Sequence, residues 1–194
     1  MKLQNKNFKK ISDTLISKPS PIFDVREARI KTPKGNIVRQ YVDHPEAVTI
    51  GVIRYNNYSK QFEVLMVKEY RIGADKVCYA LPAGLKEDDE SELDAVTREL
   101  NEETGVEITD KDSIDKIVTT ISSEGFTNEK IHIFSRMIPY DTNENNCQDL
   151  DEDELVEKVW VPFNKLTEMI VEGKITSAPT IIFNLWFLNK MTLQ

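Results

Sequence analysis

Three glutamates near the end of a predicted helix are the residues of this chain best suited to chemistry. Glu99, Glu102 and Glu103 lie within residues 99–103, and Glu99 and Glu103 are one helical turn apart. Like charges at this spacing repel by about 0.2–0.5 kcal/mol, and glutamates in a last turn also oppose the helix dipole. A helix that gathers anions there is a candidate cation site. Because the donors are oxygens, without a nearby cysteine or histidine, we expect Mg²⁺ or Mn²⁺.

The helix that would position these glutamates has sequence signals at both ends. Ser91 followed by Asp94 resembles a capping box, so the helix is expected to begin at Ser91. Gly105 is the residue type expected just after a helix end. The apolar stripe that would pack this helix consists of Leu93, Val96 and Leu100. The alternative is an ordinary solvated acidic face, which is common in glutamate-rich helices.

The spacing around this helix resembles a known motif. Gly84 is followed by Glu90 and then by the run Arg98-Glu99-Leu100-Asn101-Glu102-Glu103-Thr104-Gly105-Val106. This pattern is similar to the Nudix box. The resemblance implies a hydrolase of nucleoside diphosphate derivatives, built on a loop–helix–loop.

The flanking segments resemble the ADP-ribose pyrophosphatase branch of that family. The segments that carry this resemblance are Val38–Val48, Val67–Arg71, Leu81–Gly84, Ser123–Glu129 and Glu172–Thr180. Three positions depart from the branch: Gln40 and Ala80 replace glutamates, and Glu124 replaces a proline. Since the first two positions help to hold the sugar and base in the family, the sequence leaves another nucleotide sugar or a dinucleotide open as the substrate.

The resemblance implies a role for several of these residues. We expect Glu99 and Glu103 to be the first metal ligands, joined by Glu102, by the backbone carbonyl of Ala83 and by Glu154. Arg98, within reach of Glu102 and Asp94, is expected to orient carboxylates by paired hydrogen bonds. Glu90 is expected to tie the loop or to bind metal weakly.

The general base is expected on a separate segment, because it must approach the water from across the diphosphate. The resemblance points to the acidic run 149–154, in which Glu152 is the preferred base. A solvated acidic loop is the alternative for this run. The residues expected to contact substrate are Arg71, Arg39, Phe23, Gln40, Gly84 and Gly125.

The remaining pattern predicts an α+β fold, an α/β/α sandwich with a mixed sheet. Predicted strands cover 22–31, 36–43, 47–55, 62–70, 77–81, 114–122, 130–137 and 155–162, and two further helices cover 164–172 and 178–191. Residues 1–20 are expected to form a loose arm or a short helix. We expect an N-terminal part, 1–45, with an antiparallel hairpin for dimerisation and the substrate pocket, and a hydrolase domain, 46–194.

Composition narrows the classes of partner. The chain has 194 residues and a formal net charge of −8, which disfavours general binding to nucleic acid or anionic membranes. Cys78 and Cys147 lack metal-ligand spacing and are expected to be free thiols in the cytoplasm. We expect a homodimer, because the resembling enzymes exchange this hairpin across a two-fold axis. A non-catalytic sensor of a nucleotide sugar is the alternative from another class.

Overall fold

The structure, a computed structural model, describes residues 7, 9–18, 20, 22–142 and 155–193. The chain divides into two compact units. The first consists of Met1–Glu46 with Ile121–Lys130, and the second of Ala47–Thr120 with Ile131–Gln194. The functional division into residues 1–45 and 46–194 stays a prediction.

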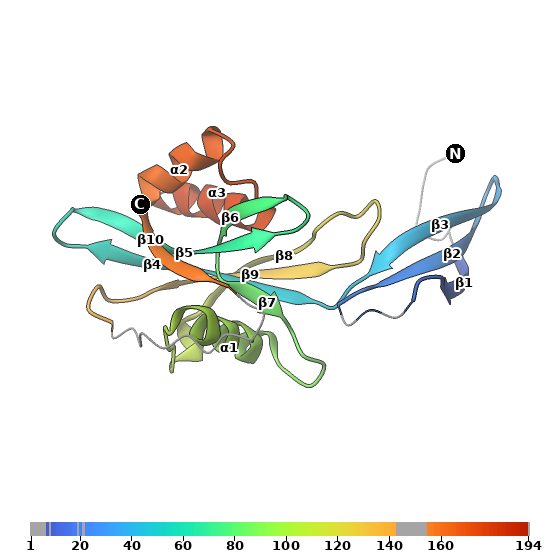
Figure 1. Cartoon of the computed structure of the whole chain (residues 1–194), viewed down its shortest axis with the longest axis horizontal. Coiled ribbons are helices and arrows are strands. Elements are labelled where there is room, and N and C mark those ends of the chain that lie inside the picture. The colour runs from blue at the N-terminus through green and yellow to red at the C-terminus, as the bar shows by residue number, and fades with distance from the viewer. Residues whose placement is uncertain (1–6, 8, 19, 21, 143–154, 194) are drawn as a thin grey trace. The chain divides into compact units, whose positions relative to one another are not determined.

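The first unit contains a three-stranded antiparallel sheet in the order β1-β2-β3 (Figure 1). Its strands are β1 (Lys9–Leu15), β2 (Asp24–Thr32) and β3 (Gly35–Asp43). The predicted hairpin corresponds to β2 and β3. The expectation of a loose arm or helix before it was wrong where the structure describes the chain, because β1 pairs with β2. Asp13 explains the added strand, since its carboxylate accepts hydrogen bonds from Lys10, Arg26 and Tyr41.

This first unit has almost no apolar core of its own. Ala28, at 3% exposure, is the one buried residue within its described part. Large apolar side chains instead face solvent on or beside the sheet, namely Ile11, Leu15, Ile16, Ile22, Phe23 and Val38. A three-stranded sheet whose apolar side chains stay exposed gains little stability from apolar burial.

The second unit is built around a mixed sheet. Its main strand order is β10-β5-β4-β9-β8, while β6 pairs with β5 and β7 pairs with β4. The β4–β9 pair is parallel, and the β4–β5, β5–β10, β5–β6 and β4–β7 pairs are antiparallel. The strand bounds are β4 (Ala47–Asn56), β5 (Gln61–Arg71), β6 (Lys76–Ala80), β7 (Ala83–Leu85), β8 (Asp115–Ile121), β9 (Lys130–Met137) and β10 (Glu157–Pro162).

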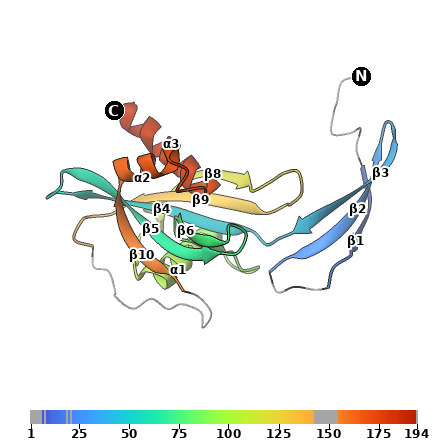
Figure 2. The same ribbon diagram turned by 45° about the horizontal axis from the view of Figure 1, so that its top comes forward.

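Helices cover both faces of this sheet, as Figures 1 and 2 show. Helix α1 (Glu92–Thr104) lies on one face, and α2 (Phe163–Val171) and α3 (Ala178–Thr192) lie on the other. A short 3₁₀ turn, η2 (Lys111–Ser113), precedes β8. The predicted α/β/α sandwich and its helices are confirmed. None of the helices in the described ranges combines the length and apolar composition needed to cross a membrane.

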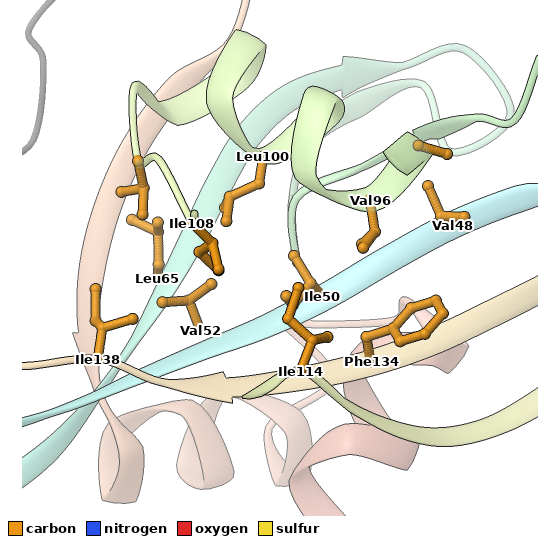
Figure 3. Close-up of a cluster of buried hydrophobic side chains, with 12 residues drawn as sticks. Val48, Ile50, Val52, Leu65, Val96, Leu100, Ile108, Ile114, Phe134 and Ile138 are labelled. Atoms are coloured by element: carbon orange, nitrogen blue, oxygen red, sulfur yellow. The ribbon is translucent and has the colours of Figure 1, made fainter. Parts of the chain in front are cut away.

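Two apolar clusters hold these layers together. One lies between α1 and the sheet and includes Val96 and Leu100 from the helix, with Ile50, Val52 and Phe134 from the strands (Figure 3). The other lies beneath α2 and α3. The predicted stripe on α1 is therefore confirmed, since Leu93 also packs against the first cluster.

Helix α3 packs directly on the backbone of β4 at Gly51. A Cβ added to Gly51 would lie 2.0 Å from the Phe183 ring, whereas one added to Gly73 would meet nothing within 4 Å. Phe183 is fully buried, so its ring has little freedom to move aside. A side chain at Gly51 must therefore strain the α3 interface.

We predict that Gly51→Ala lowers the free energy of unfolding by about 1–3 kcal/mol, as overpacked cores do. Urea denaturation followed by tryptophan fluorescence measures this change. Gly73→Ala is the matched control and should stay within about 0.5 kcal/mol of the parent protein. Equal stability of the two variants would contradict the close packing of α3 on β4.

Candidate active site

Helix α1 is fixed at both ends by the residues that the sequence singled out. The Ser91 hydroxyl accepts a hydrogen bond from the Asp94 backbone N–H, and Gly105 adopts a left-handed conformation with φ of 68°. The Gly105 N–H donates to the Asn101 carbonyl. Lys158, on β10, donates from Nζ to the Thr104 carbonyl at 2.7 Å. The positive charge of Lys158 interacts favourably with the helix dipole at this end, whereas the negative charges of the glutamates interact with it unfavourably.

Strand β7 brings the loop before α1 against the far end of the same helix. Its residues pair with β4, with Ala83 opposite Thr49. The Pro82 carbonyl accepts hydrogen bonds from the Ile50 N–H and from the Thr49 hydroxyl. The Ala83 N–H then donates to Oε2 of Glu103 at 3.0 Å. This pairing places Ala83 beside the last turn of α1.

Glu103 is a buried carboxylic acid, at 4% exposure. Burial raises the pKa of Glu103 from its ordinary value of 4.5 to about 8. The Ala83 N–H and the positive charge of Arg71 lower this pKa, whereas the negative charges of Glu99 and Glu69 raise it further. Burial wins because desolvation of the charged form outweighs one backbone hydrogen bond. A perturbed acid of this kind is typical of a functional site.

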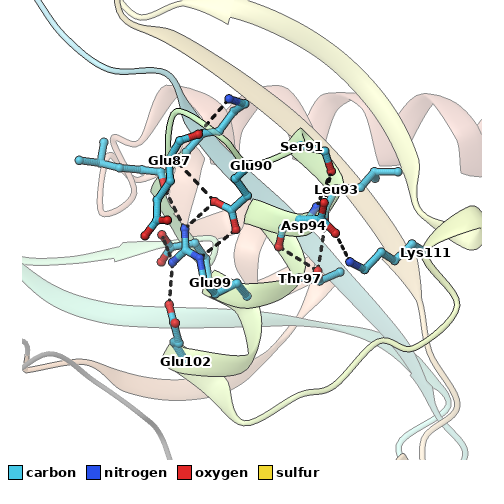
Figure 4. Close-up of polar contacts among 12 residues, drawn as sticks. Glu87, Glu90, Ser91, Leu93, Asp94, Thr97, Glu99, Glu102 and Lys111 are labelled. Carbon is cyan, nitrogen blue, oxygen red and sulfur yellow. Dashed lines mark hydrogen bonds and ion pairs between the residues drawn. The ribbon is translucent and has the colours of Figure 1, made fainter.

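Arg98 hydrogen-bonds to three carboxylates, those of Glu90, Glu99 and Glu102, which are labelled in Figure 4. Its Nε and Nη2 donate to the two oxygens of Glu90, each at 3.0 Å. Its Nη1 donates to Glu99 at 2.9 Å and to Glu102 at 2.8 Å. Nη2 also donates to the Leu85 carbonyl. One guanidinium thus links the loop before the helix to two glutamates on the helix.

The expected partners of Arg98 are therefore partly found. Glu102 contacts Arg98, whereas Asp94 instead binds Ser91 and Lys111. Glu90 lies at the loop end of the network, where its pKa is lowered by the hydrogen bonds from Arg98. The loop-tying role expected of Glu90 agrees with this bidentate pair.

Gly84 is required because the Glu99 carboxylate occupies the space beside it. A Cβ added to Gly84 would lie 2.0 Å from the Glu99 carboxyl carbon and 2.1 Å from its nearest oxygen. The side chain of Glu99 is 15% exposed and is also held by Arg98. Gly84 therefore leaves the space that the Glu99 carboxylate occupies. We expected Gly84 to be a substrate contact and did not predict this role.

The end of β5 supplies two further charges. Arg71 donates from Nη2 to Glu69 at 2.7 Å, and both residues are close enough to Glu103 to alter its pKa. Arg71 was expected here as a substrate contact. Glu69 was missed, although its spacing of two from Arg71 places both side chains on the same face of the strand and could have revealed it.

The structure thus brings together the residues of the motif and of β5, namely Ala83, Gly84, Glu90, Arg98, Glu99, Glu102, Glu103, Glu69 and Arg71. The other expected residues belong to the first unit or lie outside the described residues. Phe23, Arg39, Gln40 and Gly125 belong to the first unit, where Phe23, Arg39 and Gln40 are exposed. Glu152 and Glu154 lie outside the described residues. Their roles stay predictions.

All the candidate metal ligands of this site are oxygen atoms. Across the described parts of the chain, no three His, Cys, Asp or Glu side chains are grouped so as to hold a metal by themselves. Mg²⁺ commonly binds through one or two carboxylates, with water and substrate phosphate completing its shell. A buried Glu103 and a glycine that leaves room for Glu99 therefore fit this ion better than one that needs a complete protein cage.

This chain is similar in sequence to several known proteins. The family model of the NUDIX domain matches residues 45–181. The chain is 30% identical over 154 residues to a methanol dehydrogenase activator of Bacillus methanolicus, covering 79% of this chain and 78% of the relative. It is 29% identical over 160 residues to an ADP-ribose pyrophosphatase of Bacillus subtilis, covering 82% and 81%. It is 30% identical over 152 residues to a GDP-mannose pyrophosphatase of Yersinia enterocolitica, covering 75% and 74%.

The raised pKa of Glu103 predicts a pH-dependent stability for the metal-free protein. The folded state keeps the Glu103 proton up to about pH 8, whereas the unfolded state releases it near pH 4.5. The free energy of unfolding should therefore fall as pH rises through this window, by at most about 1.4 kcal/mol per pH unit. Urea denaturation in a chelator at several pH values measures the slope.

Glu103→Gln should flatten this slope, because the amide does not titrate. Glu107→Gln, which replaces an exposed glutamate just after the helix, is the control and should keep it. A slope that survives in Glu103→Gln would assign the titration to another group.

Proposed function

Because the chain belongs to the NUDIX domain family, we propose that it hydrolyses the pyrophosphate bond of ADP-ribose or a related nucleoside diphosphate sugar. The products are a nucleoside monophosphate and a sugar phosphate. The resemblance to the ADP-ribose pyrophosphatase branch is confirmed, and the chain is a Nudix pyrophosphohydrolase. The choice of substrate and the roles of individual residues are the proposal.

One observation carries the proposal: a buried acid, Glu103, lies within electrostatic reach of Glu99, Glu69 and Arg71 at the end of α1. A pyrophosphate brings negative charge to such a site and needs both cationic and metal neutralisation. Arg71 supplies a guanidinium, whose paired donors match phosphate oxygens. Releasing Arg71 from Glu69 would let it turn to the substrate.

The residues that would hold Mg²⁺ are Glu99 and Glu103, with Glu102 and the Ala83 carbonyl as further donors; Mn²⁺ suits the same oxygens. When bound, the ion supplies charge neutralisation at phosphorus and a more acidic water. Arg98 keeps Glu99 and Glu102 in place through its network with Glu90. Lys158 and β7 hold the helix end against which the ligands are set.

The general base is proposed to be Glu152, with Glu154 as an additional metal ligand. Both belong to the acidic run that follows β9 in sequence. The support for this assignment is the resemblance to the family alone. Among the described acids of this site, Glu99 and Glu102 are bound by Arg98, and Glu103 is bound by Ala83. A base from another segment fits that arrangement.

GDP-mannose is the second candidate substrate, and two observations favour it. Gln40 and Ala80 replace carboxylates that the ADP-ribose branch uses around sugar and base. A GDP-mannose pyrophosphatase is also among the relatives, at 30% identity. The phosphate chemistry of α1 is the same for both substrates, so the choice rests on residues outside the motif.

A regulatory role is the alternative from another class, since one relative is a methanol dehydrogenase activator. A sensor would bind a nucleotide sugar without hydrolysing it. The complete set of motif carboxylates and the Arg98 network favour catalysis.

We also propose a homodimer formed through the first unit. The exposed apolar side chains of its sheet, including Leu15, Phe23 and Val38, support this proposal, because the sheet has no apolar core of its own. In the dimer, Arg39 and Phe23 would serve the substrate pocket of the neighbouring subunit, and Gln40 and Gly125 are proposed as further substrate contacts. A cytoplasmic location stays a prediction from composition.

Hydrolysis is tested with Mg²⁺ and a panel containing ADP-ribose, GDP-mannose and UDP-glucose, with chromatography of the nucleoside monophosphates released. We predict that AMP from ADP-ribose or GMP from GDP-mannose is released faster than UMP from UDP-glucose. Glu103→Gln should lower kcat by about 10²–10⁴-fold, because metal stabilisation of the transition state contributes several kcal/mol. Glu107→Gln should keep full activity. A panel without turnover, but with tight binding, would favour the sensor.

Gly84→Ala tests the metal site by a measurement that needs no turnover. The added Cβ must displace the Glu99 carboxylate. We predict that Mn²⁺ affinity, followed by the electron paramagnetic resonance signal of the free ion, falls about 10–100-fold. Gly73→Ala, which adds a methyl group in open space, is the control. Unchanged affinity in Gly84→Ala would remove Glu99 from the ligand set.

The dimer is tested by multi-angle light scattering of the full chain. We predict a mass twice that of the 22.3 kDa chain. A monomer at micromolar concentration would contradict both the dimer and the shared pocket, but would leave the chemistry of α1 intact.

A further inference from the structure

The connection between β6 and β7 is held by hydrogen bonds from three elements. The Leu81 N–H donates to the hydroxyl of Thr180, on α3, at 3.2 Å. The Pro82 carbonyl accepts from two groups on β4, and the Ala83 N–H donates to Glu103 on α1. Helices from both faces of the sheet (Figures 1 and 2) therefore bind the same short segment, which also contains the backbone carbonyl expected as a metal ligand.

Thr180 holds Leu81 with a hydroxyl whose own orientation is fixed. Thr180 is 0% exposed and Leu81 is 1% exposed, so this hydrogen bond is shielded from solvent. A hydroxyl carries one donor and two acceptor sites. Thr180 donates to the hydroxyl of Ser177, the N-cap residue of α3, at 3.0 Å. Its oxygen is thereby left to accept from Leu81.

The position of Thr180 is set by the packing of α3 on β4. Phe183, three residues further on, lies on the same side of the helix. A Cβ added to Gly51 would lie 2.0 Å from the Phe183 ring, so the helix and the strand are in close contact. Thr49, two residues before Gly51, donates from its hydroxyl to the Pro82 carbonyl at 2.9 Å. Helix α3 and strand β4 therefore support the connection together.

Pro82 passes this support on to Ala83. The proline ring fixes one of the two backbone dihedral angles of Pro82. A displacement of Leu81 therefore meets few torsions that could absorb it before Ala83. The Ala83 N–H bonds to Glu103 at 3.0 Å, so a shift of this backbone also alters the place of a candidate metal ligand.

We propose that Thr180 is a positioning residue for the hydrolysis: through Leu81, its hydroxyl fixes the Ala83 carbonyl at the metal site. The inference rests on the proposed function, because that function makes the Ala83 carbonyl a metal ligand. Thr180 itself contacts neither metal nor substrate in this role. Helix α3 thereby takes part in a site on the opposite face of the sheet.

Thr180→Val removes the hydroxyl and keeps nearly the same side-chain volume, so the Leu81 N–H loses its partner. We predict that the Mn²⁺ affinity of the full chain falls about tenfold, as for other groups that orient metal ligands. The electron paramagnetic resonance signal of the free ion measures this affinity. Thr180→Ser, which restores the hydroxyl, should bind Mn²⁺ nearly as well as the parent protein.

Thr167→Val is the matched control. The Thr167 hydroxyl accepts a hydrogen bond from Nδ2 of Asn184, a buried residue of α3, at 2.9 Å. Both valine variants thus remove a hydroxyl that satisfies a buried N–H, and both should lower the urea midpoint of unfolding. Only Thr180→Val should lower the Mn²⁺ affinity, because the hydrogen bonds of the Thr167 hydroxyl lie within α2 and α3.

Equal Mn²⁺ affinities in Thr180→Val and Thr167→Val would overturn the proposal. A Thr180→Ser variant that binds Mn²⁺ as weakly as Thr180→Val would also overturn it. Thr180→Ala, which lacks the hydroxyl and adds no methyl group beside Leu81, decides the matter if Thr180→Val fails to fold. Failure of the proposed function gives a different result, because the parent protein then releases no nucleoside monophosphate, whatever Mn²⁺ affinity the Thr180 variants have.

Discussion

The burial of one carboxylate, Glu103, is the constraint on which the rest of the site depends. Burying a charged carboxylate costs several kcal/mol, and the hydrogen bond from the Ala83 N–H does not offset this cost, so Glu103 keeps its proton up to about pH 8. The cost is tolerated because α1 is fixed by the apolar cluster beneath it and by Lys158 at its end. A site that holds an acid in an unfavourable place is one in which a cation gains the most from binding.

Arg98 offsets the electrostatic repulsion among the acidic side chains of this helix. Its guanidinium satisfies Glu90, Glu99 and Glu102 at once and reaches the Leu85 carbonyl. Lysine could not hold this arrangement, because it offers a point charge without a fixed fork of donors. The loop and the helix are thereby joined through side chains as well as through β7. Gly84 completes the fit by leaving room for Glu99.

The sequence predicted much of this arrangement, because its signals were local. Ser91 and Gly105 marked the ends of α1, and the helix begins and ends beside them. Strand β1 was missed, because it is held by contacts of Asp13 with residues far along the chain. Glu69 was missed although its spacing from Arg71 placed it on the same face of β5, because the sequence does not show that this face lies close to Glu103. Spacing along the chain cannot report the contacts made between strands.

The central claim is that Glu99 and Glu103 together hold the metal that carries the pyrophosphate. A crystal structure with Mn²⁺ and a non-hydrolysable ADP-ribose analogue, recorded at the manganese absorption edge, tests it directly. We predict an anomalous peak bonded to carboxylate oxygens of both Glu99 and Glu103. A peak bonded to neither residue, with the analogue in place, would contradict it.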